Sequence, residues 1–347
     1  MIELLGSGYF PVEWNGKTFI DTFDSMLNGA QEISIATGYC SEESIAKLIG
    51  LYEKEYTAHL ELIIGMHYFE GFTKAQFDGL RYLDEILKRG ERGNVFLANR
   101  TKYHGKIYLV KYFPNTYKSI VGSSNISKLN IMERIFDNDV FTDENAITKP
   151  LKSFFSELRD KNCVSLTDVN RDEIKIHNNR DLFENYLDVE KVSPAKLTSL
   201  KTRASLSNVV FDIPMKTEEK SNLNVFFGKG RENTANGITL PRDWYEVELI
   251  VSKSITSDAS YPHKREFTVY TDDGFSFQCK TSGDYSKNFR SAKDLKILGK
   301  WLKGRLENSG ALIAGKPVTE HVLNSYGRNS MKMSRLNDDE WFLDFGV

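Results

Sequence analysis

Two neighbouring β-like runs with polar residues at one end constrain this chain more than any other feature. Residues 103–110 read Y-H-G-K-I-Y-L-V, and residues 119–125 read S-I-V-G-S-S-N. Because side chains alternate across a strand, His104 and Lys106 are expected on the same face. The second run ends in a small, polar, turn-forming tail, Gly122 to Asn125. The pattern predicts two strands that bring an imidazole, an ammonium and a carboxamide together.

Those three groups suit a phosphate better than any other common group. The ammonium of Lys106 neutralises negative charge, and the amide of Asn125 donates hydrogen bonds. The imidazole of His104 can attack or move a proton near neutral pH. The sequence therefore predicts a phosphate site at residues 103–125.

The flanking sequence alternates strands and helices. Helical apolar spacing covers 18–30 and 73–90, and a further helix is expected over 147–159. Ser41 is the expected N-cap of another helix, with Glu42 and Glu43 in its first turn. Short apolar strands are expected at 32–37, 60–65, 94–98 and 139–142. The order indicates an α/β sandwich with a sheet covered on both faces.

From about residue 205 the pattern becomes β-rich. Aromatic and β-branched runs separated by turn signals predict strands at 209–211, 224–227, 244–251, 266–270, 275–279 and the final stretch 331–345. Helices are expected at 292–308 and after Pro317. A length of 347 residues favours two domains. We expect an α/β domain over 1–165, a linker over 166–204, and a β-rich α+β domain with a small open barrel over 205–347.

Composition narrows the class of protein. Hydrophobic content of 40% is ample for packed cores, and a net charge of −2 leaves any preference for polyanions to local patches. Three scattered cysteines fit a reducing compartment and exclude a disulfide framework or a thiolate zinc site. No signal-peptide pattern or apolar run of about 20 residues is present, so a cytoplasmic location is expected.

The polar motif resembles that of the phospholipase D superfamily, in which His-x-Lys precedes Gly-Ser-x-Asn and a glutamate. His104, Lys106, Ser123, Asn125 and Glu133 occupy those positions; Lys111 stands where relatives often have aspartate. The resemblance implies metal-independent phosphodiester cleavage without a cofactor. In that scheme His104 forms a phosphohistidine, Lys106 and Asn125 grip the phosphate oxygens, and Glu133 orients an imidazole.

The superfamily uses two His-x-Lys motifs, and this chain has one. None of the other histidines, at 59, 67, 177, 263 and 321, precedes a lysine by two residues in a comparable strand. The resemblance therefore implies a homodimer through the N-terminal domain, with one composite site on the two-fold axis.

Basic residues suggest the substrate. Residues 92–132 hold seven Lys or Arg and no acidic residue, and residues 280–305 hold eight Lys or Arg against Asp284 and Asp294. A basic surface around the site favours double-stranded DNA over a neutral lipid headgroup, although each lysine could equally be an ordinary solvated side chain. Loop 226–237 is rich in Gly, Asn and Arg. The expected DNA contacts are Lys229, Arg231, Asn233, Lys280, Lys287, Asn288 and Arg290.

The two-part layout resembles restriction endonucleases of the BfiI and NgoFVII type, which join a phospholipase-D-like nuclease to a B3-like DNA-binding pseudobarrel. The resemblance implies a type II enzyme that cuts double-stranded DNA at or near a specific sequence. An accessory ATPase or methyltransferase of the same system is a further partner to consider. Two alternatives stay open: a phosphodiesterase for lipid or RNA, and a DNA-binding protein with a vestigial nuclease centre.

Overall fold

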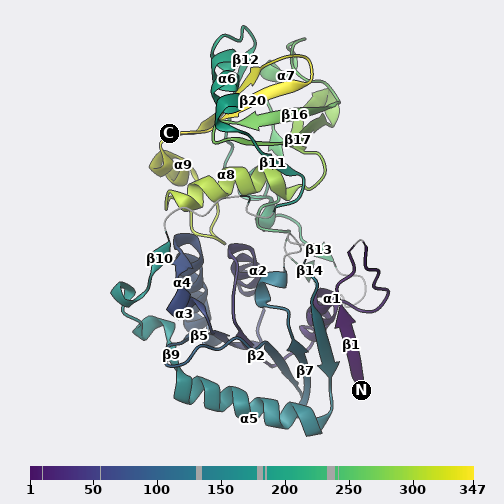
Figure 1. Cartoon of the computed structure of the whole chain (residues 1–347), viewed down its shortest axis with the longest axis vertical. Coiled ribbons are helices and arrows are strands. Elements are labelled where there is room, and N and C mark those ends of the chain that lie inside the picture. Colours follow the sequence, from purple (N-terminus) through teal and green to yellow (C-terminus); the bar gives the residue numbers. More distant parts are fainter. Residues whose placement is uncertain are drawn as a thin grey trace. The chain divides into compact units, whose positions relative to one another are not determined.

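The computed structural model describes residues 1–9, 11–54, 56–129, 135–177, 183, 186–232, 239–240 and 242–347, without the side chains of 231, 232, 239 and 240. The chain divides into two compact units (Figure 1). The first unit comprises residues 1–179 and 231–240, and the second comprises 180–230 and 241–347. Each unit is described on its own below.

An eight-stranded sheet forms the centre of the first unit within the described residues, in the order β1-β8-β7-β6-β2-β3-β5-β9. Strands β2, β3 and β5 are parallel to one another, and the remaining neighbours pair antiparallel. The strands are β1 (Ile2–Gly6), β2 (Glu32–Thr37), β3 (His59–Ile64), β5 (Gly93–Ala98), β6 (Ile107–Tyr112), β7 (Thr116–Gly122), β8 (Asn138–Thr142) and β9 (Cys163–Ser165). Two short pairs complete this unit: β4 (Phe72–Thr73) with β10 (Ile176–His177), and β13 (Arg231–Glu232) with β14 (Thr239–Leu240).

Two helices of the first unit, α2 and α4, begin at capping boxes. Ser41 and Thr73 each accept a hydrogen bond from the third residue of the helix that follows, and that residue's side chain bonds back to the cap. These capping boxes satisfy otherwise unpaired N–H groups. The helices are α1 (Phe19–Met26), α2 (Glu42–Glu53), α3 (His67–Glu70), α4 (Lys74–Arg89) and α5 (Asn145–Asn162), with 3-10 turns at Ile126–Leu129, Leu166–Asp168 and Arg171–Glu173.

The two faces of this sheet are covered unequally. Helices α1, α2 and α4 pack on one face over a large core that contains Phe23, Ile49 and Leu83. The other face carries a smaller core around Phe155 of α5. Strand alternation explains the division, because Ile107 belongs to the α5 face and its neighbour Tyr108 to the opposite one. In Figure 1, α5 runs along the side of the sheet opposite α2 and α4.

The second unit is built on a curled sheet in the order β12-β19-β20-β16-β17-β18-β15, with β11 paired to β17. Strands β16 and β20 pair in parallel, and the others pair antiparallel. Its strands are β11 (Val189–Lys191), β12 (Val210–Pro214), β15 (Leu249–Ile250), β16 (Glu266–Thr271), β17 (Phe275–Ser282), β18 (Asn288–Ser291), β19 (Ser330–Arg335) and β20 (Glu340–Asp344). Its helices are α6 (Pro194–Ser205), α7 (Lys253–Thr256), α8 (Lys296–Asn308) and α9 (Glu320–Tyr326), with 3-10 turns at Val225–Phe227 and Asp284–Ser286.

Helix α8 carries a buried polar cluster as well as an apolar face. Lys303 is fully buried, donates to the backbone oxygen of Trp244 at 2.6 Å and lies 3.9 Å from the centre of its indole ring. Glu307 accepts hydrogen bonds from the Trp244 indole and the Tyr245 hydroxyl, each at 2.6 Å. Gly299 allows the close approach, since a Cβ there would lie 1.9 Å from the Tyr245 carbonyl oxygen. These contacts fix α8 to residues 244–245.

The fold confirms the predicted classes and corrects two strands. An α/β unit is followed by a β-rich unit with two longer helices, α6 and α8. Residues 224–227 are not a strand, because Val225–Phe227 form a 3-10 turn whose Phe226 packs against Trp244. Of 244–251, only Leu249 and Ile250 pair in the sheet. Trp244 and Tyr245 bond to Glu307 of α8 instead. Among the described residues, no helix is both long and apolar enough to cross a membrane.

Candidate active site

Strand ends at one edge of the first sheet gather the predicted phosphate-binding residues. Strands β2, β3 and β7 end at this edge, and β6 begins there, because β6 is antiparallel to both β2 and β7. The loop before β6 brings His104 and Lys106 to the edge, and the turn after β7 brings Asn125. The residues of the pattern at 103–125 thus converge in space, but His104 and Lys106 lie in the loop before β6 and not in a strand, so strand alternation does not place them.

His104 is exposed. The residue before it, Tyr103, lies close to Gly65, which directly follows β3. The Tyr103 amide donates to the Gly65 carbonyl oxygen at 3.2 Å, and a Cβ on Gly65 would lie 1.9 Å from the Tyr103 oxygen. The Tyr39 ring meets the His104 imidazole edge-on, with 5.8 Å between ring centres. His104 is therefore held at the edge of the sheet with its ring open to solvent.

Lys106 is buried beneath the imidazole, with 4% of its surface exposed. Its Nζ donates to the His104 carbonyl oxygen at 2.6 Å and lies 3.3 Å from both ring nitrogens. The ammonium of Lys106 therefore lies directly against the imidazole of His104. Burial lowers the pKa of Lys106, while the charges of Asp137 and Asp139 act in the opposite direction.

Asn125 has a defined orientation. Its Oδ1 accepts a hydrogen bond from the Tyr39 backbone N–H at 3.1 Å and lies 3.3 Å from the Thr37 hydroxyl. Because a backbone N–H needs an acceptor, the atom facing it must be the amide oxygen. The amide nitrogen is then turned away from Tyr39 as a hydrogen-bond donor.

Two aspartates support the turn that carries Asn125. Asp139 belongs to β8, and Asp137 directly precedes that strand. Ser124 is fully buried, and its backbone N–H and hydroxyl donate to the two carboxylate oxygens of Asp139, at 3.0 and 2.6 Å. Burial raises the pKa of Asp139. Ser123 donates to Asp137 at 2.7 Å and accepts from the Asn138 N–H at 3.1 Å. The hydroxyl of Ser123 is thus part of the scaffold here. Glu133 lies outside the described residues.

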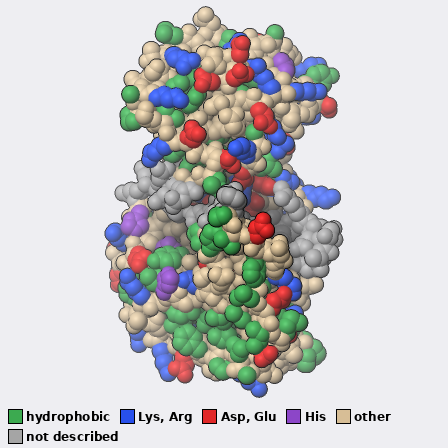
Figure 2. Space-filling model, turned by 45° about the vertical axis from the view of Figure 1, so that its right-hand side comes forward, with side chains coloured by type: hydrophobic (Ala, Val, Ile, Leu, Met, Phe, Trp, Pro, Cys, Tyr) green, Lys and Arg blue, Asp and Glu red, His purple; other side chains and the backbone are tan. Residues whose placement is uncertain are grey.

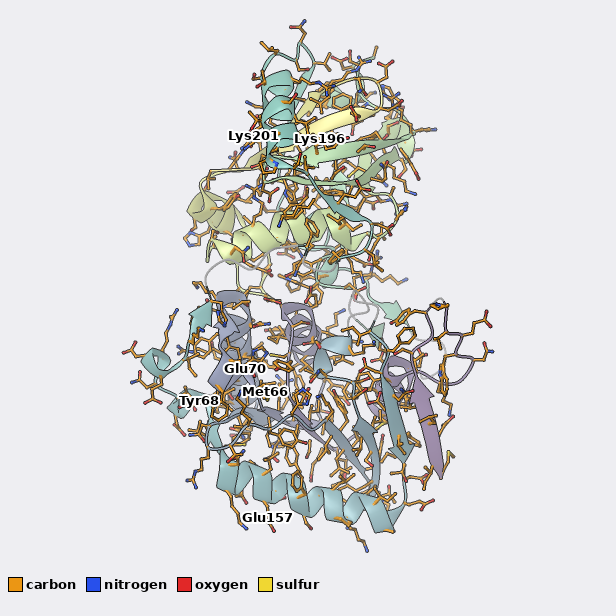
Figure 3. All side chains as sticks on the ribbon, viewed as in Figure 1. Met66, Tyr68, Glu70, Glu157, Lys196 and Lys201 are labelled. Atoms are coloured by element: carbon orange, nitrogen blue, oxygen red, sulfur yellow. The ribbon has the colours of Figure 1, made fainter. Side chains whose placement is uncertain are left out.

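A second polar group lies on the α3 side of the site, where Figure 3 labels Met66 and Glu70. The Tyr39 hydroxyl donates to Glu70 at 2.7 Å, and Lys102 pairs with Glu70 at 3.2 Å. The hydrogen bond to Glu70, followed by burial, raises the pKa of Tyr39 to about 12. Tyr39 therefore keeps its proton near neutral pH.

The basic run at 92–132 does not form one patch around this site. Lys111 pairs with Glu32 at the start of β2, which is the opposite end of the sheet. Arg92 donates to the carbonyl oxygens of Tyr52 and Tyr56. Lys102 and Lys106 lie at the site, and Lys128 pairs with Asp137 beside it. The local positive charge comes from a few residues of the run.

Three of the predicted DNA contacts lie on the polar face of the second sheet. Lys280 and Arg290 are opposite each other in the β17–β18 register, and Asn288 follows the same face two residues away. Glu248 reaches both Asn288, at 3.2 Å, and Arg290, at 3.7 Å. Lys229 and Lys287 are exposed. The Arg231 side chain and Asn233 lie outside the described part of the chain.

Sequence reasoning missed the residues that orient the site from other strands. Thr37, Tyr39, Asp137, Asp139 and Glu70 were not selected, although T-G-Y stands at the end of the strand predicted at 32–37. Only the strand order places β2 beside β6, and hence Thr37 beside Asn125. Within the described ranges, no cluster of three or more His, Cys, Asp or Glu side chains could hold a metal ion.

Comparison with known proteins agrees with this layout. The family model described as the NgoFVII restriction endonuclease N-terminal PLD domain matches residues 17–174. The model described as the NgoFVII C-terminal B3-like DNA-binding domain matches residues 201–337. Fold and matches together define a phospholipase-D-like nuclease joined to a DNA-binding domain. The chain belongs to the NgoFVII restriction endonuclease family, and its second unit has the curled sheet of a B3-like pseudobarrel.

Solved structures of phospholipase D nucleases are also similar to the chain. The phospholipase D family member NUC from Salmonella typhimurium is 12% identical, over 48% of this chain and 98% of its own, with a TM-score of 0.34. NucT from Helicobacter pylori is 19% identical, over 47% of this chain and 99% of its own, with a TM-score of 0.32. No curated protein sequence matches the chain.

Proposed function

We propose that this restriction endonuclease cuts double-stranded DNA at or near a specific sequence, without a metal, through a phosphohistidine on His104. The placement of the Lys106 ammonium and the Asn125 carboxamide around one exposed imidazole carries the proposal. The two donors match the non-bridging oxygens of a phosphodiester, where negative charge grows in the transition state. The domain boundaries at about 165 and 205 are part of the same proposal.

The reaction proceeds in two displacements. A lone pair of the neutral His104 ring attacks phosphorus, the bond from phosphorus to the leaving deoxyribose oxygen breaks, and that oxygen takes a proton from a general acid. Water then attacks the phosphohistidine, loses a proton to the same group, and releases His104. Lys106 holds charge in both steps. The identity of Glu133 as the carboxylate that orients an imidazole belongs to this proposal.

The general acid requires a second histidine, and the described part of the first unit offers no suitable one. His67 is buried, with Nδ1 2.9 Å from the Gly71 oxygen and Nε2 accepting from the Cys40 N–H. His177 bonds to the Glu70 carbonyl oxygen, and His59 begins β3 at the opposite end of the sheet. We infer that His104 of a second copy supplies the acid in a homodimer.

An uncovered part of the first sheet is suited to hold that second copy. Leu4, Val140 and Val121 stand opposite one another across β1, β8 and β7, on the face that α5 covers only partly. Leu4 is 53% exposed and Val140 is 38% exposed. Figure 2 shows hydrophobic side chains gathered on the corresponding face of this unit. Val121 lies two residues before Ser123, so a copy packed here would be close to the site.

Cleavage of plasmid DNA in EDTA tests the chemistry. The wild-type protein is expected to cut, and His104→Ala is expected to lose at least about 10³-fold in rate while still binding DNA. Denaturation in alkali during turnover should leave one cut DNA strand joined to the wild-type chain through its phosphate, because the bond between phosphorus and a histidine nitrogen survives base and is hydrolysed by acid. Cleavage by His104→Ala at the wild-type rate would refute the mechanism. A wild-type protein that binds DNA and never cuts it would favour a vestigial centre.

Sedimentation tests the second copy. The double variant Leu4→Glu/Val140→Glu is expected to become monomeric and inactive, because two charges cannot be buried in an apolar interface. Phe113→Glu is the matched control, since Phe113 is also exposed and apolar but lies in the turn between β6 and β7. A double variant that stays dimeric and active removes this face from the proposal.

Sequence-specific binding by the second unit is tested in the full chain. The inactive His104→Ala variant should retain one duplex from a random pool, and Lys280→Ala/Arg290→Ala should reduce that selection. Equal retention of all duplexes by His104→Ala would contradict the assignment of specificity.

A further inference from the structure

The segment Thr37-Gly38-Tyr39 touches both the carboxamide and the imidazole of the site. It begins with the last residue of β2, and its backbone is bonded to the residues after β3. The Gly65 N–H donates to the Thr37 carbonyl oxygen at 2.8 Å, and the Met66 N–H donates to the Gly38 carbonyl oxygen at 3.0 Å. Thr37 and Gly38 are buried, and Tyr39 is half-buried. The segment is thus a rigid part of the sheet edge.

We propose that Thr37, Gly38 and Tyr39 are positioning residues that fix the Asn125 amide and the His104 ring before DNA binds. The inference rests on the proposed roles of His104 and Asn125. It adds that the geometry of both groups is set by one segment, which comes from a different part of the sheet from either motif.

The orientation of Asn125 depends on the first and third residues of the segment. The Tyr39 N–H is a fixed donor to Oδ1, and the Thr37 hydroxyl lies at bonding distance from the same oxygen. The hydroxyl oxygen of Thr37 also accepts a hydrogen bond from the N–H of Ile126, the residue after Asn125, at 3.1 Å. Turning the amide over would bring its NH₂ group against the Tyr39 N–H, which pairs two donors. The single hydroxyl proton of Thr37 is shared between Asn125 Oδ1 and the Tyr39 carbonyl oxygen, which lies 3.2 Å away, so Thr37 holds the backbone after Asn125 and supports its side chain together with Tyr39.

Gly38 sets the distance between the two reactive groups. A Cβ at this position would lie 3.2 Å from Asn125 Oδ1 and 3.3 Å from His104 Cδ2. Both contacts are tighter than ordinary van der Waals packing, so even a methyl group would have to displace one side chain or the other. The glycine is required by close approach, because the backbone of Gly38 forms the floor between the imidazole and the carboxamide.

Tyr39 restricts rotation of the imidazole. Its ring meets His104 on one side and the buried His67 on the other, with 5.4 Å between the centres of the Tyr39 and His67 rings. Its hydroxyl bonds to Glu70, which also pairs with Lys102, two residues before His104. The raised pKa of Tyr39 makes the phenol a weaker acid than an ordinary tyrosine. Its contribution is the placement of its ring.

Preorganised donors accelerate a reaction because they are not rearranged as charge develops. Loss of this segment should therefore lower kcat and leave KM for DNA almost unchanged, since the second unit supplies the specific binding. A general loss of folding would instead lower the active fraction, without a change specific to the chemical step.

Kinetics on the full chain test the proposal. Gly38→Ala is expected to lower kcat about 100-fold or more, and Thr37→Val about 10-fold, with Thr37→Ser restoring the rate. Tyr39→Leu should lower kcat about 10-fold, whereas Tyr39→Phe, which keeps the ring, should lose less than about threefold. Ile86→Val is the control. It removes one methyl group from the large core under α1, α2 and α4, away from the site, and should leave kcat unchanged.

Orthovanadate binding, a mimic of the phosphoryl transition state, gives a second readout. Gly38→Ala and Thr37→Val should weaken it by the same factors as kcat, while Ile86→Val should not. If His104→Ala is inactive and both segment variants keep the wild-type kcat and vanadate affinity, the positioning role is wrong and the proposed function stands. If His104→Ala cuts as fast as wild type, the proposed function itself fails.

Discussion

Removal of the Asp139 carboxylate is the most informative structural perturbation, because one side chain supports the whole turn that carries Asn125. Asp139 is 2% exposed and accepts both the backbone N–H and the hydroxyl of Ser124, which is itself fully buried. Asp139→Ala would leave both donors without a partner in the protein interior.

The cost follows from those two bonds. A buried donor left unsatisfied costs about 1–3 kcal/mol, and a hydrogen bond to a carboxylate is at the upper end of that range. Against this stands the desolvation of the carboxylate, which is visible in its raised pKa and is relieved in the variant. We expect a net loss of about 3 kcal/mol from the free energy of unfolding of the first unit. In Asp139→Asn the amide oxygen can still accept from the Ser124 N–H, and the Ser124 hydroxyl can turn to accept from the amide NH₂. The free energy of unfolding should therefore fall by only about 1 kcal/mol.

Urea unfolding provides the assay, with the two units expected to unfold in separate transitions. Asp139→Ala should shift the urea midpoint of only one transition, which identifies it as that of the first unit. A substitution in α8 should leave this midpoint unchanged. Cleavage should fall together with stability, because the turn holds the proposed phosphate donor. A shift below about 0.5 kcal/mol for Asp139→Ala would refute the reasoning that these bonds support the turn.

Three further predictions concern Lys106, Gly299 and Lys303. Burial lowers the pKa of Lys106, and the proposed reaction needs it protonated, so kcat/KM should fall with rising pH at a pKa below the usual 10.5; Lys106→Met should lack this limb. Gly299→Ala should destabilise the second unit by about 2 kcal/mol or more in urea unfolding, because its Cβ meets the Tyr245 carbonyl oxygen. Burial lowers the pKa of Lys303 to about 7, so between pH 7 and 10 the unfolded chain binds a proton that the folded chain does not. Stability of the second unit should therefore rise with pH in that window, by up to about 1.4 kcal/mol per pH unit, and this slope should be absent in Lys303→Met.

Local patterns in the sequence were sufficient for the strands that carry the motif. His104 and Lys106 lie just before β6 and Asn125 lies just after β7, within 22 consecutive positions, and these two strands pair directly with each other. A hairpin with a short connection was enough to bring the three residues together. The caps Ser41 and Thr73 were equally readable, because a capping box involves residues only three positions apart.

Contacts between distant segments could not be read in this way. Thr37 lies 88 residues from Asn125. They meet because β2 and β7 flank β6 and are both antiparallel to it, so that both strands end on the same side of the sheet. Nothing in the local sequence specifies that strand order. Trp244 and Tyr245 misled the strand prediction for a related reason: their β-like composition serves packing against α8, not a ladder of backbone hydrogen bonds.

Strand order in the second unit also determines when that unit can form during protein synthesis. Strands β19 and β20 are made after all the others, yet they sit between β12 and β16. Until residues 330–344 have left the ribosome, β12 has no neighbour and β16 has an open edge. The nuclease unit has by then been translated in full, so it is expected to fold first. An expression fragment that stops before residue 330 would leave the DNA-binding sheet in two separate pieces.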